Sequence, residues 1–526
     1  MDMAMSGDGE RRSAVGRGRR ARPLDIVRHV VCVLALMWTG IVNGQPFFFP
    51  DSTNYIRAAD LAAHLASGRT VSTVWTARYA EQLPAGQPAP TTPAKAPSAN
   101  GSASAEADHR TSANDLKSGL VMSGRSPYIG ALIYAGWVLG WFWPFVLLQA
   151  VIAYLLIIMV LRRFDLASAR IVTLVTLALA LTTSLPTYNS MLLADGFASF
   201  GMLALALLAL PGRLSRCQIA FLVAVMVMSA IAHLTHLTML VGMTGALVLL
   251  RLLGWLRPPP RAWYAAIGTI VVAVLALQAT TLATRIAIGR APQLLPLLTS
   301  RFYADGPGQK FIEAGCDGNR FAACRIPMGK PYNNAAWLFS VEPQYGAYML
   351  ASPEQRRIMG EEDVDFAIAV LRAYPVEQIT ASARNTLQQL LWIDYDALNQ
   401  GCGTAPTCWE SLPPVVRARF MQSLSGRNAW PRDLMNAILY AAVIASLLAL
   451  AATLPMLARR DREAYVLMRN LLVITGIGML VCCFFGGAVA DPQYRYQGRL
   501  IWLPVFFALV AVLRVRQARP VEHGLR

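Results

Sequence analysis

Charged residues are scarce in this chain of 526 residues, since Asp, Glu, Lys and Arg make up 15% of it while hydrophobic residues make up 55%. So little charge excludes an ordinary soluble globular protein. The chain also lacks a Walker-type loop, a dinucleotide-binding fingerprint and a nucleophile-elbow motif. Without a phosphate-binding loop, an ATP-driven pump is disfavoured. No repeat with a period of about 20–50 residues runs along the chain either.

The apolar residues gather into stretches long enough to cross a membrane. About ten such stretches occur, and a helix of about 20 apolar residues spans a hydrocarbon core roughly 30 Å thick. The predicted spans are 24–43, 143–161, 168–184, 193–210, 217–235, 237–256, 263–286, 433–458, 469–490 and 500–516. The first span has a long apolar run and no clear cleavage pattern after it, so we expect it to remain as an anchor. The sequence therefore predicts an all-α, polytopic integral membrane protein.

The arginines predict the orientation of these spans. They cluster before the first span and after alternate later ones, as at Arg11–Arg12, Arg162–Arg163, Arg459–Arg460 and Arg514–Arg516. Positive residues mark cytoplasmic connections, so both termini are predicted to be cytoplasmic. The net charge of +17 is then explained by the positive residues that orient the spans, with some attraction to anionic lipid. It indicates no nucleic-acid partner. The Arg- and Ala-rich composition suggests a bacterial inner (plasma) membrane.

Four regions follow from this topology. They are a basic cytoplasmic tail (1–23), an N-terminal transmembrane module (24–286), a periplasmic, partly helical domain (287–432) and a C-terminal transmembrane module (433–526). The outward loop 44–126 contains a predicted helix from Ser52 to Leu65, with Asp51 suited to cap its first turn. Its later part, 83–118, is rich in Pro, Ala, Ser and Gly and is expected to be a flexible insertion.

Four cysteines share the predicted periplasmic domain: Cys316, Cys324, Cys402 and Cys408. An oxidising exterior allows two disulfides among them. Sequence proximity favours Cys316–Cys324 and Cys402–Cys408 among the three connectivities. A zinc site is the weaker alternative, because neither pair has the two-residue spacing of a zinc knuckle.

Polar residues follow several spans on the predicted outward side. Asp51 comes directly after the first span and Asp195 after the third, and an acid at that depth is costly without a partner or a use. The other members of this set are candidate substrate-binding residues, namely Arg125, His233, His236, Tyr494, Arg495 and Arg499. All of these clusters are predicted to emerge on one face of the membrane.

Such a set suits the transfer of a group from a phosphate to a hydroxyl. A carboxylate accepts the hydroxyl proton, and guanidinium groups hold the phosphate. Asp51 is the candidate base, and capping a helix is its alternative role. Arg495 and Arg499 are candidates to hold the phosphate, and their alternative is a solvated pair at the surface. Asp195 has three candidate roles: orienting the acceptor, sharing a divalent metal ion with Asp51, or pairing with an arginine. His233 and His236 are candidates to bind phosphate or metal, or to anchor a helix end through the backbone.

These motifs resemble the GT-C type of membrane glycosyltransferase. The resemblance rests on Pro50-Asp51-Ser52-Thr53-Asn54-Tyr55, Arg125-Ser126-Pro127-Tyr128, Leu185-Pro186 with Asp195, and Arg495-Tyr496, in this order and sidedness. It covers roughly 24–260 and 469–516. Members of that superfamily use polyprenyl-phosphate-linked sugars and carry a functional carboxylate in the first outward loop, which the resemblance assigns to Asp51.

The leading hypothesis is therefore transfer of a sugar from a polyprenyl-phosphate donor to a hydroxyl acceptor on the outer face, with membrane lipids and the donor as partners. A flippase or exporter of an envelope lipid or polysaccharide is one alternative. It would place charges at several depths of a central cavity, whereas the acids and arginines here gather at one boundary. A non-catalytic envelope-assembly protein is the other alternative.

Overall fold

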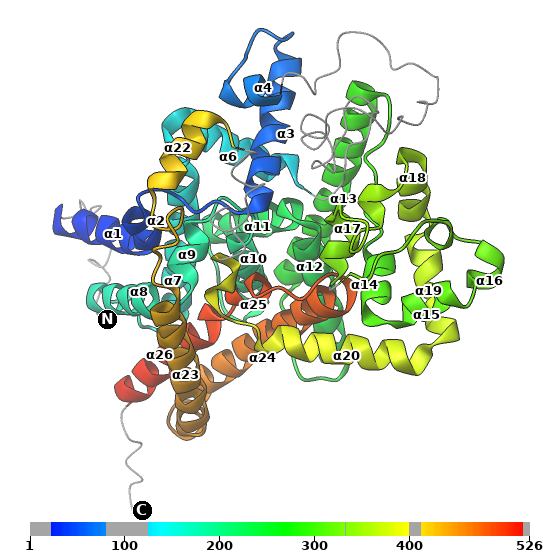
Figure 1. The fold of residues 1–526 in the computed structure, drawn as a ribbon. Helices are drawn as coiled ribbons and strands as arrows, with labels where there is room; N and C mark the ends of the chain where they lie inside the picture. The colour runs from blue at the N-terminus through cyan, green and yellow to red at the C-terminus, as the bar shows by residue number, and fades with distance from the viewer. Residues whose placement is uncertain (1–22, 80–124, 332, 399–411, 519–526) are drawn as a thin grey trace, which may run out of the picture.

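The computed structural model describes residues 23–79, 125–331, 333–398 and 412–518 (Figure 1). These residues are predominantly helical and form no β-strand, apart from an isolated bridge between Phe47 and Met191. The fold is therefore all-α, as predicted. The predicted insertion 83–118, the pair Cys402 and Cys408, and nearly all of the basic tail lie outside the described residues.

Six helical segments in the described residues are long and apolar enough to cross a membrane. They are α7 (Trp143–Arg163), α12 (Leu234–Leu252), α13 (Pro260–Ile288), α23 (Arg432–Arg460), α24 (Arg462–Phe484) with the π-helical turn η5 (Phe485–Val489), and α25 (Arg495–Gly498) with α26 (Trp502–Gln517). Shorter apolar helices of 10–17 residues accompany them, namely α6 (Pro127–Gly140), α8 (Ala169–Thr182), α10 (Gly196–Ala209) and α11 (Arg216–Ala232). These helices fit an all-α membrane protein.

The predicted first span is two helices in the structure. Helix α1 (Pro23–Ala35) ends before Leu36, and α2 (Trp38–Asn43) follows after a turn. The side-chain amide of Asn189 donates to the Leu36 carbonyl at 3.0 Å, and the Ser190 hydroxyl donates to the Met37 carbonyl at 3.4 Å. Backbone oxygens released by the break thus have partners, which a membrane protein requires. Asn189 and Ser190 belong to the short helix α9 (Leu185–Asn189) and its cap.

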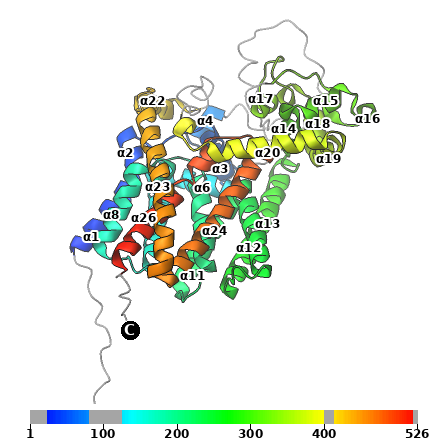
Figure 2. The same cartoon turned by 90° about the horizontal axis from the view of Figure 1, so that it is seen from below.

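The long helices run side by side as a bundle (Figure 2). Every residue of α10 is buried, as expected for a helix that is apolar on all sides and lies inside a bundle. Helix α13 instead exposes Ile267, Val271 and Leu275, the pattern of a surface that faces lipid.

A helical module with its own core follows α13 at one end of the bundle (Figure 2). It comprises α14 (Leu297–Asp305), α15 (Pro307–Glu313), α16 (Cys316–Asn319), η2 (Ala322–Arg325), α17 (Asn334–Phe339), η3 (Tyr348–Leu350), α18 (Pro353–Glu361) and α19 (Asp363–Ala373). Trp337, Tyr348 and Phe366 lie at the centre of its core. We call the end of the bundle that carries this module the module end.

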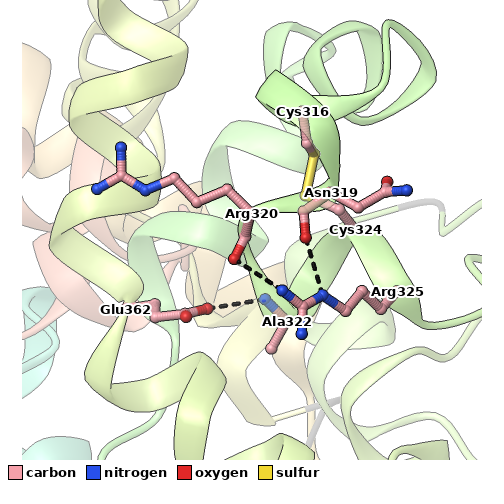
Figure 3. Close-up of a disulfide and its surroundings, with 7 residues drawn as sticks. All are labelled: Cys316, Asn319, Arg320, Ala322, Cys324, Arg325 and Glu362. Atoms are coloured by element: carbon pink, nitrogen blue, oxygen red, sulfur yellow. Dashed lines mark hydrogen bonds between the residues drawn. A yellow bond between two sulfur atoms is a disulfide. The ribbon is translucent and has the colours of Figure 1, made fainter.

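The Cys316–Cys324 disulfide, favoured by sequence proximity, forms at the edge of the module (Figure 3). Around it, Arg325 donates to the Asn319 carbonyl at 2.8 Å, and the Glu362 carboxylate accepts from the backbone N–H of Ala322 at 2.8 Å. The bridge and these bonds fix a short loop to the start of α19.

Helix α20 (Pro375–Leu391) lies across the module end of the bundle (Figure 2). It packs directly on η5, where a Cβ on Gly487 would stand 2.5 Å from the Asn385 carbonyl oxygen. After it come η4 (Tyr395–Leu398) and α22 (Pro414–Gln422). The chain then returns to α2, since the Asn43 side chain accepts from the Ser425 N–H at 2.7 Å.

Helix α3 (Pro50–Ala66) also lies at the module end, followed by α4 (Val74–Tyr79). The buried carboxylate of Asp60 accepts hydrogen bonds from Thr73 and Thr76, which ties α4 to α3. On its other side α3 packs closely against α6, because a Cβ on Gly130 would lie 2.6 Å from the Tyr55 carbonyl oxygen. Only glycine permits this approach of two helix backbones.

Replacing Gly130 by alanine should therefore destabilise the protein by about 1–3 kcal/mol, the usual cost of overpacking. The measurement is the apparent melting temperature of the purified protein in detergent. Gly268→Ala is the matched control, because no atom of the described residues lies within 4 Å of its added Cβ and alanine favours the helix. Equal melting temperatures for the two variants would contradict the close α3–α6 contact.

Candidate functional site

Two segments far apart in sequence meet where α3 begins. The Phe47 N–H donates to the Ser190 carbonyl at 2.9 Å, and the Leu192 N–H donates to the Phe47 carbonyl at 3.0 Å. This pairing holds Phe47–Asp51 beside Ser190–Asp195. Gln149 of α7 stabilises this pairing, since its side-chain amide donates to the Asn189 and Met191 carbonyls.

A third segment, residues 491–499, closes onto the same place. Gly498 lies so close to the Tyr188 hydroxyl that any Cβ would collide with it. The Ser184 hydroxyl also donates to the Gly498 carbonyl. The arginines of this segment are therefore placed by α9, next to both aspartates.

Five charged side chains from four segments form an alternating cluster there. Asp51 accepts from Arg125 at one carboxylate oxygen and from Arg495 at the other, the latter at 3.1 Å. Arg495 also lies 3.9 Å from Asp195, and Arg499 donates to Asp195 at 2.7 Å. The order is Arg125, Asp51, Arg495, Asp195, Arg499, and we call these residues the ionic cluster.

The ionic cluster is buried and positively charged. Side-chain exposure falls from 31% at Arg125 to 15% at Asp51 and 3% at Arg499. Three arginines against two aspartates leave one positive charge. The Nε atoms of Arg495 and Arg499 are buried without a hydrogen-bond partner in the described residues, a costly arrangement that an anion would relieve.

Aromatic rings complete the surroundings of these arginines. The Arg495 guanidinium lies 4.6 Å from the ring centre of Phe49, and that of Arg499 lies 5.1 Å from the ring of Tyr496. Sequence reasoning named neither ring as a site residue, although Tyr496 belongs to the Arg495-Tyr496 motif. The available signal was their position, directly before Pro50-Asp51 and directly after Arg495.

Asp51 does not act as the helix cap that the sequence allowed. Phe49 occupies the cap position of α3 without a side-chain hydrogen bond, and the Ser52 hydroxyl accepts from the Phe49 N–H at 3.0 Å. The Asp51 carboxylate is committed to arginines instead. Burial by itself raises its pKa, but the charges and hydrogen bonds of Arg125 and Arg495 outweigh burial and hold the pKa of Asp51 well below its usual range.

A second network anchors the arginine-bearing segment to the module. The fully buried Asp305 of α14 pairs with Arg301 and also accepts from Gln378 and Asn385 of α20. Arg301 in turn reaches Asp491 at 3.3 Å. Sequence reasoning missed Arg301 and Asp305, because no motif marks them and Asp491 lies 190 residues further along the chain.

A pair of reciprocal bonds reinforces this anchor. The Gln389 side chain donates to the Gln493 carbonyl at 2.9 Å and accepts from the Gln493 N–H at 2.7 Å. The ring of Tyr494 stacks on Trp392, with centres 4.3 Å apart. Tyr494, predicted as a substrate-binding residue, thus contacts the segment that follows α20.

The two histidines lie near the ionic cluster and both bond to backbone. His233 accepts from the Thr235 N–H at 3.2 Å and so caps α12, while His236 Nδ1 lies 3.2 Å from the Ser229 carbonyl. Nδ1 of His236 therefore donates, and its buried Nε2 has no partner in the described residues. These contacts match the anchoring role among the predicted alternatives.

The carboxylates of the site are arranged for arginine pairing. Asp51 and Asp195 both accept from guanidinium groups. Within the part of the chain that the structure describes, no three His, Cys, Asp or Glu side chains gather as a metal-binding group. Of the predicted roles for Asp195, pairing with an arginine is the one with a visible contact.

Comparison with known proteins identifies no relative of this chain. No family model matches it, and no curated protein or solved structure does so either. The functional interpretation therefore depends on the motifs and on the geometry of the ionic cluster.

The lowered pKa of Asp51 predicts how stability depends on pH. A depressed folded-state pKa stabilises the fold above the unfolded value of about 3.9, and this contribution is lost as pH falls through the folded value. Asp51→Asn should lower the unfolding free energy by about 3 kcal/mol near pH 7, because it removes the negative charge that Arg125 and Arg495 share. The difference between wild type and variant should persist to about pH 5 and narrow below about pH 4.

Thermal unfolding across this pH range measures the effect. Glu377→Gln is the control, since Glu377 pairs with Lys310 at an exposed site and its removal should change little. A wild-type-to-variant difference that does not depend on pH would contradict the ion pairing of Asp51.

Proposed function

We propose that this protein is a GT-C-like membrane glycosyltransferase that moves a sugar from a polyprenyl-phosphate donor to a hydroxyl acceptor at the outer face of a bacterial inner membrane. The single observation that carries the proposal is the ionic cluster. Its five members come from segments spread over most of the chain, yet they meet in one buried place at one end of an apolar bundle. In this proposal about ten spans cross the membrane, the module end faces outward, and both termini are cytoplasmic.

The charge of the ionic cluster suits such a donor. A sugar linked through a phosphodiester carries one negative charge, which matches the one positive charge left by three arginines and two aspartates. The phosphate gains charge as the sugar leaves, so guanidinium groups beside it favour the departing state over the bound donor. The Nε atoms of Arg495 and Arg499, which have no partner among the residues that the structure describes, supply N–H groups for its oxygens.

The proposed reaction uses Asp51 as the base. The bond between the sugar C1 and the phosphate oxygen breaks, and the oxygen keeps the electron pair. The acceptor hydroxyl forms the new bond to C1 on the face opposite to the phosphate, so the configuration at C1 is inverted. The hydroxyl gives its proton to Asp51. Asp195, held by Arg499, keeps the central Arg495 between two carboxylates.

The arginine partners of Asp51 also connect donor binding to base strength. With both arginines attached, the pKa of Asp51 is low, and a carboxylate of such low basicity is a weak proton acceptor. A donor phosphate that draws Arg125 or Arg495 toward itself removes part of this stabilisation, so the pKa of Asp51 rises toward its ordinary range. Donor binding thereby prepares the base.

Asp51→Asn tests this chemistry. We expect turnover to fall by about 100-fold or more, the usual contribution of a general base. The assay supplies purified protein in liposomes with a panel of polyprenyl-phosphate sugars and a bacterial envelope extract as the source of acceptor hydroxyls, and it measures the release of free polyprenyl phosphate. Asp165→Asn, which changes an 81% exposed aspartate at the other end of the bundle, should keep wild-type turnover.

Arg499→Lys separates phosphate binding from proton transfer. It keeps the charge but loses the planar fork, so it should raise the KM for the donor more than Asp51→Asn does. Unchanged turnover in a well-folded Asp51→Asn protein would remove Asp51 from the reaction. Wild-type protein that consumes no donor in the panel would count against the transferase itself.

A further inference from the structure

A pocket of about 540 Å³ opens at the end of the bundle opposite the module. Its walls come from the last turn of α7, the loop after α10 and the first turns of α24. The lining residues are Arg163, Pro211, Gly212, Arg462, Glu463, Val466 and Leu467. Arg462 and Cys482, which contacts Arg499 of the ionic cluster, are twenty residues apart on α24. The pocket and the cluster are thus separated by roughly 30 Å of helix.

Arg163, which lines this pocket, has guanidinium nitrogens that lack acceptors in the described residues. Its Nε and Nη2 atoms are buried without a hydrogen-bond partner in the described residues. The guanidinium lies over Gly212, where a Cβ would stand 2.7 Å from Nη1. Glycine at this position therefore makes room for the arginine head, and buried N–H groups without acceptors cost free energy until an acceptor arrives.

The surrounding charges also favour an anion. Arg261 lies near enough to repel Arg163. The guanidinium of Arg261 donates hydrogen bonds to the backbone carbonyls of Leu208, Leu210 and Gly212. Two nearby acids, Asp461 and Asp165, both pair with Arg514. Among the residues that line the pocket, Glu463 carries one negative charge, and Arg163 and Arg462 carry two positive charges.

The apolar wall indicates what kind of anion fits. Val466 and Leu467 lie on α24, one of the helices long and apolar enough to span a membrane. The pocket therefore has charged residues on one part of its lining and apolar residues on another. A phosphate attached to acyl chains matches both surfaces, whereas a free ion would use the arginines alone. Basic pockets between helices at a membrane surface are known to take anionic headgroups.

We propose that this pocket binds the phosphate of an anionic phospholipid, with Arg163 and Arg462 as its ligands. The acyl chains lie along Val466 and Leu467. This site is separate from the ionic cluster, and it does not depend on the proposed transferase activity. It holds a lipid of the surrounding membrane at the end of the bundle where α7, α10 and α24 meet.

The test compares Arg163→Gln with Arg162→Gln. Both remove one charge from the same helical turn, but Arg162 is exposed and does not line the pocket. The full-length proteins are purified with equal amounts of phosphatidylglycerol and phosphatidylcholine, and retained lipids are counted by native mass spectrometry. Arg163→Gln should reduce phosphatidylglycerol retention about ten-fold, as expected for loss of a charge-assisted contact, and Arg162→Gln should not.

Two further arms keep the test decisive. Arg462→Gln, on the opposite exposed wall, should also lower phosphatidylglycerol retention, and it reports on the pocket even if Arg163→Gln fails to fold. Inorganic phosphate is titrated into protein with phosphatidylcholine alone, with the melting temperature as readout. Stabilisation by phosphate that needs Arg163, without selective lipid retention, would assign the pocket to a free anion and overturn the lipid proposal. Equal retention by wild type and all three variants would overturn the site.

Discussion

The pairing of Asp51 with Arg125 and Arg495 is the interaction on which the module end depends. An aspartate just beyond an apolar helix and an arginine 444 residues later are each costly to bury alone. Together they form part of a chain of alternating charge in which each group has an opposite neighbour. The first loop, α6 and the 491–499 segment must therefore meet for any of these residues to be buried at acceptable cost.

Close backbone approaches make that meeting geometrically feasible. Gly130 brings α6 against α3 and thereby places Arg125 near Asp51, while Gly498 seats the arginine-bearing segment on Tyr188. Gly487 lets α20 lie on η5. From the far side, Asp305 and Arg301 hold Asp491 through the module. The module is thus coupled to the ionic cluster through four residues of chain, Asp491 to Tyr494, and fixes where Arg495 begins its helix.

The sequence predicted the members of the ionic cluster because each lies at or near the edge of an apolar run. Asp51, Asp195, Arg495 and Arg499 are visible in that way, and the structure brings them together. It could not predict the Arg301–Asp305–Asp491 network, whose partners are joined only by the folding of a separate module. Hydropathy also missed the break between α1 and α2, because its stability comes from Asn189 and Ser190, more than 150 residues away.

The number of spans was hard to read for a related reason. A hydropathy pattern shows that a segment avoids water, but not whether it touches lipid or other helices. Helix α10 is apolar and wholly buried but has only 14 residues. Helix α13 has 29 residues, and much of its length is exposed on the surface of the bundle. Both read as spans in the sequence.

The arginines differ in how much of their hydrogen-bonding capacity the described residues satisfy. Arg261 and Arg301 donate to carbonyls and carboxylates within the chain, so they hold the fold. Arg495 and Arg499 are paired, but their buried Nε atoms have no hydrogen-bond partner in the described residues, and neither do the Nε and Nη2 atoms of Arg163. Since a folded protein rarely leaves buried donors unsatisfied, these atoms mark where an anion would add most to stability. They lie at both ends of the bundle, at the two places where we propose that a phosphate binds.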